Sequence, residues 1–337
     1  MPVEPERRVT ITAIAREAGV SVPTVSRVVN GRSDVSPKTR ARVEELLHQY
    51  GYRRRASRVR QSAGLIDLVF NDLDSPWAVE IIRGVEDVAH ASAVGTVVSA
   101  IHRRSAATRQ WLTNLRARAS DGVILVTSTL EPTHQAELRR LNVPMVVVDP
   151  VGGPALDVPT IGATNWAGGL AAVEHLTGLG HRRIGFVAGP AQLLCSRARL
   201  EGYRAGLEAA GLPMAAELVR QGDFYHESGF LAGAELLRLD DPPTAIFASS
   251  DQMAFGVYEA VRQRGLHVPG EVSVLGFDDL PEARWSSPPL TTVRQPLAEM
   301  GMLAARTVLR LAQGEEIESP RIELATELVV RDSTTKL

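Results

Sequence analysis

Residues 10–30 have the sequence TITAIAREAGVSVPTVSRVVN, and this stretch decides the fold of the N-terminal region. Its first apolar residues recur at helical spacing, at Ile11, Ile14, Ala15 and Ala18. Gly19 supplies a tight stop, and Ser21 can cap a second helix. Pro23 lies in the first turn of that helix, where its missing N–H costs nothing. Two short helices joined by a glycine turn are typical of a helix-turn-helix.

A third helix is predicted from Ser36-Pro37 to about Gln49, with Val43 and Leu46 turned inward. Residues 1–52 are therefore predicted to form an all-α helix-turn-helix headpiece. Residues 53–64 contain five arginines and little apolar material, which is typical of a linker.

From residue 65 the pattern changes to apolar strands that alternate with amphipathic helices. Strands are predicted at 65–70, 95–99, 122–126, 144–148, 184–188, 244–248 and 272–276. Continuous apolar strands between helices indicate α/β structure with parallel sheets covered on both faces. About 270 residues exceed one such sheet, so we expect two lobes.

Charge is divided unevenly along the chain. Residues 1–60 carry 13 Lys and Arg against six Asp and Glu, a balance of +7, whereas the remaining 277 carry 24 and 33, a balance of −9. A basic head on an acidic body suggests that the head alone meets a polyanion such as DNA.

Several classes of protein are disfavoured. No apolar run is long enough to span a membrane and no secretory leader is apparent, so we expect a cytoplasmic protein. The chain lacks the phosphate-loop, nucleophile-elbow and dinucleotide motifs of α/β enzymes. Its histidines and its single Cys195 show no metal-ligand spacing. We therefore expect no catalytic residues, no metal and no cofactor.

Five segments carry a further signal through their order along the chain. They are residues 20–30, residues 184–190 with Arg197 and Gly202-Tyr203, residues 250–254, residues 274–279 and residues 289–296. Together these segments resemble the LacI/GalR family of transcriptional regulators. The resemblance implies a headpiece (1–52), a hinge (53–64) and a two-lobed, periplasmic-binding-protein-like core (65–337). Lobe one would be 65–162 and 293–323, and lobe two 163–292 and 324–337. It also implies a homodimer on a palindromic double-stranded operator.

In a helix-turn-helix the second helix enters the major groove. Val22 and Pro23 suit a thymine methyl group, and Arg27 can pair with guanine. Alternatively, Val22 only starts the helix and Arg27 only clamps a phosphate. Short polar groups are predicted to hold phosphates, at Thr10, Thr24, Ser26, Asn30 and Thr39.

The hinge departs from the family pattern. Gly51-Tyr52 is followed by an arginine-rich stretch about three residues shorter than usual, and Val59 takes the place of the leucine that enters the minor groove. One alternative is an arm whose Arg55 and Arg58 contact phosphates or a narrow minor groove. Another alternative is a linker that its arginines only keep solvated.

A ligand is expected where parallel strands end. Aromatic platforms for a sugar are Trp77, Phe224 and Trp285. The family positions and strand ends add polar candidates, at Asp74, Asp149, Arg197, Ser250, Asp251 and Asp278. Alternatively, the two tryptophans anchor loops, Asp149 caps a turn, and Arg197 and Asp278 form a salt bridge between the lobes.

These features predict a repressor of carbohydrate-utilisation genes whose operator affinity responds to a small mono- or oligosaccharide. A purine corepressor is the alternative within the family, because part of the family uses one. From other classes, an α/β enzyme and a transport-type sugar-binding protein remain. Loss of operator binding with retention of ligand binding after removal of the head distinguishes a regulator from both.

Overall fold

The computed structural model describes residues 11–29, 35–50, 63–102, 104–126, 131–151 and 158–337. The chain forms two compact units, Met1–Ser62 and Ala63–Leu337. The predicted hinge, 53–64, lies outside the described residues except for its last two.

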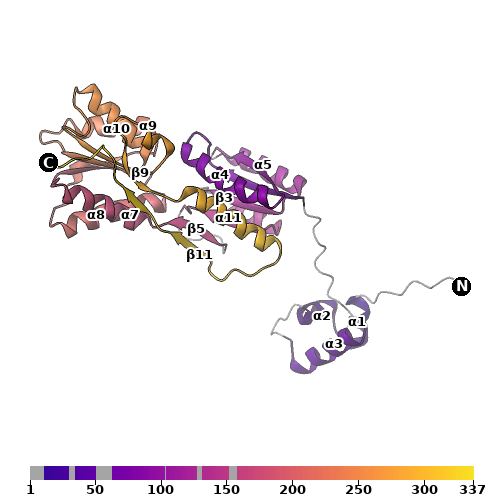
Figure 1. Cartoon of the computed structure of the whole chain (residues 1–337). Coiled ribbons are helices and arrows are strands. Elements are labelled where there is room, and N and C mark those ends of the chain that lie inside the picture. Colours follow the sequence, from indigo (N-terminus) through magenta and orange to yellow (C-terminus); the bar gives the residue numbers. More distant parts are fainter. Residues whose placement is uncertain (1–10, 30–34, 51–62, 103, 127–130, 152–157) are drawn as a thin grey trace. The chain divides into compact units, whose positions relative to one another are not determined.

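The smaller unit contains three helices, α1 (Ile11–Ala18), α2 (Val22–Val29) and α3 (Pro37–Gln49) (Figure 1). Each contributes a fully buried aliphatic side chain to one small core, namely Ile14, Val25 and Val43. Gly19 has φ +67°, a conformation that glycine adopts without strain, and so permits the tight turn between α1 and α2. The predicted helical headpiece is confirmed.

Six strands form the first sheet of the larger unit, in the order β11-β5-β4-β3-β1-β2, all parallel. They are β1 (Leu65–Phe70), β2 (Gly95–Ala100), β3 (Gly122–Val126), β4 (Met145–Val148), β5 (Thr160–Ala163) and β11 (Arg321–Leu324). Successive side chains alternate between its two faces. One face packs on α4 (Pro76–Ala91) and α11 (Leu297–Ala312), the other on α5 (Ser105–Arg118) and α6 (Pro132–Arg140).

The second sheet has the order β12-β10-β9-β8-β6-β7, and only its edge strand β12 is antiparallel. Its strands are β6 (Ile184–Ala188), β7 (Val219–Gln221), β8 (Ala245–Ala248), β9 (Ser273–Asp278), β10 (Thr291–Arg294) and β12 (Glu327–Val329). Helices α7 (Asn165–Gly178) and α8 (Leu194–Ala209) cover one face, and α9 (His226–Leu236) and α10 (Asp251–Gln263) the other (Figure 1). Two 3-10 turns, Ala216–Leu218 and Pro281–Arg284, complete the described elements.

The two parallel-rich sheets confirm the predicted α/β core, and each predicted strand is present with bounds that differ by at most two residues. The chain passes between the sheets after β5, after β10 and between β11 and β12. We had predicted that the second crossing follows Thr292. Because β10 belongs wholly to the second sheet, the crossing instead follows Arg294. Five short strands of three or four residues escaped prediction, namely β5, β7, β10, β11 and β12.

Within the described ranges, no helix combines the length and apolarity needed to cross a membrane. Likewise, the described part of the chain contains no group of three His, Cys, Asp or Glu residues that could hold a metal ion.

Candidate functional site

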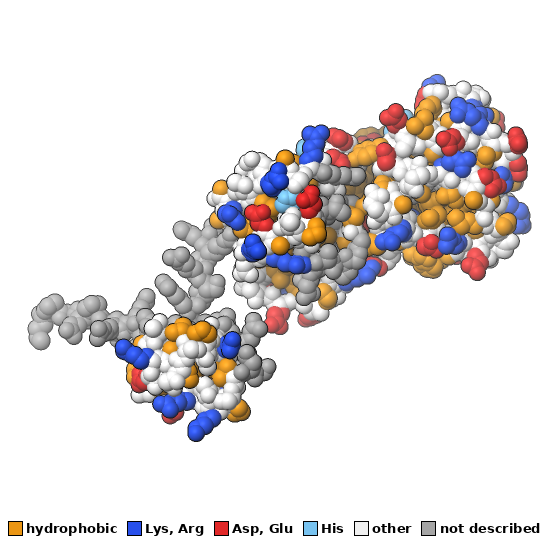
Figure 2. Space-filling model, turned by 180° about the vertical axis from the view of Figure 1, so that it is seen from behind, with side chains coloured by type: hydrophobic (Ala, Val, Ile, Leu, Met, Phe, Trp, Pro, Cys, Tyr) orange, Lys and Arg blue, Asp and Glu red, His pale blue; other side chains and the backbone are white. Residues whose placement is uncertain are grey.

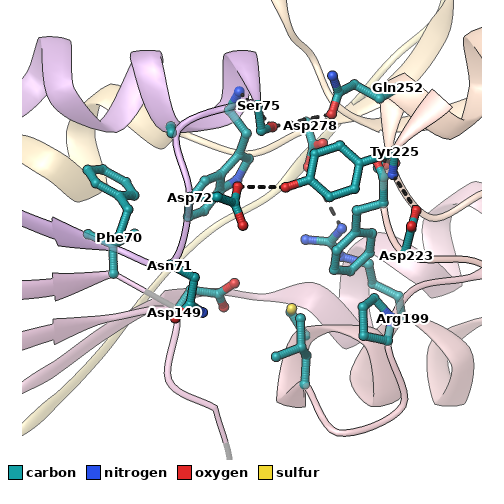
Figure 3. Close-up of a pocket in the computed structure, with 18 residues that line it drawn as sticks. Phe70, Asn71, Asp72, Ser75, Asp149, Arg199, Asp223, Tyr225, Gln252 and Asp278 are labelled. Carbon is teal, nitrogen blue, oxygen red and sulfur yellow. Dashed lines mark hydrogen bonds and ion pairs between the residues drawn. The ribbon is translucent and has the colours of Figure 1, made fainter. Parts of the chain in front are cut away.

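A cavity lies where strands of both sheets end, between the two lobes of the larger unit (Figure 3). The first lobe contributes residues that follow β1 and β4, including Asp72, Ser75, Trp77 and Asp149. The second lobe contributes residues from the beginnings of α8 and α10, the loop before α9 and the end of β9, including Arg199, Phe224, Tyr225, Ser250 and Asp278. Carboxyl ends of parallel strands are the usual ligand sites of α/β sheets.

Arg199 lies on α8 and is only 3% exposed. Its Nε donates to Oδ1 of Asn165 at 2.8 Å, and its Nη1 donates to the carbonyl oxygen of Ser249 at 2.6 Å. Its guanidinium carbon lies 3.8 Å from the ring centroid of Phe277 and 5.4 Å from that of Phe224. These contacts hold the guanidinium in one orientation at the cavity wall.

We had predicted Arg197 for this site. Its side chain is exposed and does not line the cavity. On α8 the buried residues are Cys195, Ser196, Arg199, Gly202, Tyr203, Gly206 and Leu207. Positions 197 and 199 are two steps apart along the helix, which corresponds to a rotation of about 200° around its axis. The helical phase therefore turns Arg197 to solvent and Arg199 inward.

Asp278 ends β9, and its side chain is nearly completely buried beside Arg199, with Oδ1 3.7 Å from Nη1. The same oxygen accepts a hydrogen bond from Nε2 of Gln295 at 2.6 Å. Burial raises the pKa of Asp278 to about 6, although Arg199 and Gln295 both act to lower it. Its backbone has φ +131°, an uncommon conformation that is typical of functional sites.

Asp149 follows β4 in the first lobe, is 7% exposed and has φ +51°. Burial raises its pKa, while the positive charge of Arg199 and a hydrogen bond with Cys195 lower it. The Cys195 thiol is buried, and desolvation, aided by the nearby Asp149, raises its pKa. Cys195 is therefore a protonated thiol rather than a reactive thiolate.

Phe224 lines the cavity with a strained backbone, at φ +79°. Gly189, which follows β6, makes room for it, because a Cβ at position 189 would lie 2.1 Å from the phenyl ring. Phe70 and Trp77 line the cavity from the first lobe. The cavity thus has aromatic rings from both lobes.

Hydrogen bonds between described residues connect the lobes at this cavity. The Tyr225 hydroxyl donates to Oδ1 of Asp72 at 2.6 Å, and the Ser75 hydroxyl donates to Oε1 of Gln252 at 3.3 Å (Figure 3). Since both pairs join residues more than 150 positions apart in sequence, they depend on the relative placement of the lobes.

Asp251 is completely buried but does not line the cavity. Its Oδ1 accepts from the Thr292 hydroxyl at 2.5 Å and its Oδ2 from the backbone N–H of Leu280 at 2.8 Å. Burial, and then the charge of Asp278, raise its pKa. Asp251 thus supports the loop behind Asp278, whereas its neighbour Ser250 lines the cavity and caps α10 by accepting from the Met253 N–H.

Two other predicted residues lie elsewhere. Asp74 is exposed and does not line the cavity. Trp285 is 76% exposed and lines a separate hollow with Arg284 and Arg294.

The sequence analysis did not name several of the residues that line the cavity, including Asp72, Arg199, Asp223, Tyr225 and Gln252. Asp72 was within reach, because it follows the end of β1 more closely than Asp74 does. The phase of α8 could also have pointed to Arg199. Tyr225 has no local signal, since its partner Asp72 lies in the other lobe.

In the headpiece, α2 buries Val25 and Val28 and exposes Val22, Pro23 and Arg27. Lys and Arg side chains are spread over the visible face of this unit (Figure 2).

The short polar residues predicted to hold phosphates have varied placements. The Thr24 hydroxyl lies 2.8 Å from the hydroxyl of Ser21, and the Thr39 hydroxyl accepts from Ser36 at 2.8 Å, so both belong to helix caps. Ser26 is half-buried on α2. Five predicted DNA contacts lie outside the described residues, namely Thr10, Asn30, Arg55, Arg58 and Val59.

Both units are similar to known protein families. Residues 10–55 match the bacterial regulatory proteins of the lacI family, and residues 173–334 match the periplasmic binding protein-like domain. The HTH-type transcriptional regulator CelR of Thermobifida fusca is 35% identical over 340 residues, covering 98% of this chain and 100% of CelR.

Solved structures of other proteins are similar over nearly the full length. A transcriptional regulator CelR–cellobiose complex has a TM-score of 0.75 and 34% identity, covering 97% of this chain and 100% of that one. A lac repressor dimer bound to operator and the anti-inducer ONPF has a TM-score of 0.71 and 31% identity, with coverage of 98% and 100%. This chain therefore belongs to the lacI family of bacterial regulatory proteins.

Proposed function

We propose that the protein is a homodimeric repressor of carbohydrate-utilisation genes whose affinity for a palindromic operator is controlled by a sugar bound between its lobes. The observation that carries the ligand class is the Arg199–Asp278 pair, fixed beside aromatic rings in the interlobe cavity. Similarity to a regulator solved with cellobiose and to a repressor dimer solved on its operator supports the same proposal.

The chemistry of the cavity suits a sugar. Carboxylates such as Asp149 and Asp278 accept hydrogen bonds from ring hydroxyls, and Arg199 donates to hydroxyl oxygens. The faces of Trp77 and Phe224 suit the apolar C–H face of a pyranose. A purine would use the same rings for stacking, so it is the alternative ligand to be tested.

On DNA, we propose that α2 enters the major groove, where Val22 and Pro23 contact a thymine methyl and Arg27 pairs with guanine. The polar residues Thr10, Thr24, Ser26, Asn30 and Thr39 would set the register on phosphates. Val59, Arg55 and Arg58 are proposed to meet the minor groove. No catalytic role is proposed for any residue.

Coupling between the two sites follows from linkage. A ligand that binds the lobes more tightly when the protein is off DNA lowers operator affinity, by no more than the ratio of its two affinities. The reciprocal effect must hold, so operator DNA lowers the affinity for that ligand by the same factor.

The test is titration calorimetry of the full chain with a sugar panel and with purine bases, together with fluorescence anisotropy on palindromes from its own upstream region. We expect a sugar to bind and to change operator affinity. A variant lacking residues 1–62 should keep sugar binding and lose operator binding, since the core is a separate compact unit. A purine as the only ligand, or operator affinity unchanged at saturating sugar, contradicts the proposal.

A further inference from the structure

The residues that line the interlobe cavity carry an excess of negative charge. Among the described residues that line it, four are carboxylates, Asp72, Asp149, Asp223 and Asp278, and one is basic, Arg199. The formal charge of the lining is therefore −3 when all of these side chains are ionised. Asp72 and Asp223 lie on opposite lobes, so the excess is contributed from both sides (Figure 3).

Arg199 is not free to neutralise an added anion. Its Nη1 and Nε are already used by the Ser249 carbonyl and by Asn165, and its charge is shared with Asp278 at 3.7 Å. An anionic ligand would have to compete with these buried partners for one guanidinium.

Helix N-termini oppose the carboxylates but do not outweigh them. The cavity is lined by residues from the first turns of α4, α8 and α10, and a helix N-terminus carries roughly half a positive charge. Three such ends amount to about +1.5, which is less than the carboxylate excess. In addition, Ser75 and Ser250 accept hydrogen bonds from N–H groups of α4 and α10, which reduces the positive potential of these two helix ends.

From this balance we infer that the cavity selects uncharged polyhydroxy ligands and rejects their phosphorylated or carboxylated counterparts. The inference rests on the proposed function, since it concerns the ligand of the same cavity. It narrows that function to a regulator that senses a free sugar or glycoside rather than a sugar phosphate or sugar acid.

The size of the discrimination follows from Coulomb's law. Two like unit charges about 5 Å apart, at an effective dielectric constant of about 20, disfavour binding by more than a factor of 100. A phosphate monoester, with a charge of about −1.5 to −2 at neutral pH, should be rejected at least as strongly as a carboxylate. Low salt should increase the discrimination and high salt should reduce it.

The experiment compares matched pairs by calorimetry on the full chain at pH 8. The pairs are glucose with glucose 6-phosphate, glucose with glucuronate, cellobiose with cellobionate, and ribose with ribose 5-phosphate. We expect a neutral member to bind about 100-fold more tightly than its charged counterpart. A charged member that binds equally well, or more tightly, overturns the inference.

A double substitution tests the cause. Asp72→Asn with Asp223→Asn removes two charges but keeps an amide oxygen that can accept the Tyr225 hydroxyl. The ratio between neutral and charged ligand should fall at least tenfold. Glu208→Gln, an exposed change about 14 Å along α8 from Arg199, should leave the ratio unchanged. An unaltered ratio in the double variant, with the same melting temperature as the parent, overturns the assignment to these carboxylates.

Failure of the inference and failure of the proposed function look different. A sugar phosphate that binds tightly and changes operator affinity overturns the inference and leaves the proposed function intact. If only a purine binds, the sugar effector is refuted, and adenosine against adenosine 5′-monophosphate then decides the charge inference. If no neutral or charged member of these pairs binds, both are refuted.

Discussion

The guanidinium of Arg199 and the carboxylate of Asp278 lie 3.7 Å apart in a site where both side chains are almost wholly buried. Both belong to the second lobe, so the pair does not bridge the lobes, in contrast to the alternative that we drew from Arg197. A buried ion pair is a weak source of stability, because desolvation offsets much of the attraction. Its place in the cavity wall is better explained by ligand binding.

Replacing Arg199 with Lys should lower effector affinity by about 10- to 100-fold, because lysine lacks the planar set of donors that spans Asn165, Ser249 and a ligand hydroxyl. The matched control is Arg197→Lys, two residues away on the same helix and exposed. Calorimetry with the effector measures both. Equal losses in the two variants would show that Arg199 has no special role.

Effector affinity should depend on pH near 6, where Asp278 titrates. A ligand hydroxyl donates to the ionised carboxylate, so affinity should fall by up to about tenfold per pH unit below the pKa. The stability of the unliganded protein should change in the opposite sense. Because the pKa of Asp278 is raised in the folded protein, its ionised carboxylate destabilises the fold above pH 6, and this destabilisation is lost as the pH falls from 6 toward 3.8. The positive charge of Arg199 lowers and the carboxylate of Asp149 raises the pKa of Asp278, and the charge of Asp278 in turn raises the pKa of Asp251.

Binding isotherms between pH 5 and 8 test this dependence, with circular dichroism to show that the fold is retained. In Asp278→Asn the pH dependence should shrink, with weaker binding throughout. A flat profile for the parent protein across this range would contradict a role for the ionised carboxylate.

Asp67 is a completely buried carboxylate in β1 that accepts hydrogen bonds from Trp111 Nε1 at 3.2 Å, from Arg118 and from Ser120. Asp67→Ala should destabilise the larger unit by about 3–5 kcal/mol, because it leaves these donors without an acceptor. Urea denaturation measures the change. Asp121→Ala is the control, because this part-buried carboxylate accepts hydrogen bonds from the backbone N–H groups of residues 63–65, and its loss should cost less.

On DNA, Arg27→Ala should cost about 1–3 kcal/mol and relax the base preference at one position of each half-site. Arg42→Ala, an exposed arginine on α3 outside the major-groove helix, is the control. Anisotropy titrations at a single salt concentration should compare operator with random duplex. If Arg27→Ala weakens both duplexes equally, the residue holds a phosphate and does not recognise a base.

Much of the fold was predictable because its signals are local. The spacing of Ile14, Val25 and Val43 predicted three packed helices, and apolar runs such as 65–70 and 184–188 predicted the central strands. Edge strands such as β7 and β12 lack such a signal, since three residues that are half-buried or exposed form no recognisable run.

Predicted residues that directly end a strand or cap a helix line the cavity, namely Asp149, Asp278 and Ser250. The predicted aromatic residues Trp77 and Phe224, which lie close to such ends, line it as well. Asp251, adjacent to Ser250, points behind the cavity wall because the first turn of α10 directs it toward Thr292.

By itself, the sequence determined the two-unit plan and the alternation of parallel strands with helices, because both depend on residues close together along the chain. The tertiary structure decided which charged groups meet. The phase of α8 brings Arg199 rather than Arg197 to Asp278, and the approach of the two lobes joins Tyr225 to Asp72 across 153 positions. Contacts of this kind depend on packing between distant segments, which local periodicity does not encode.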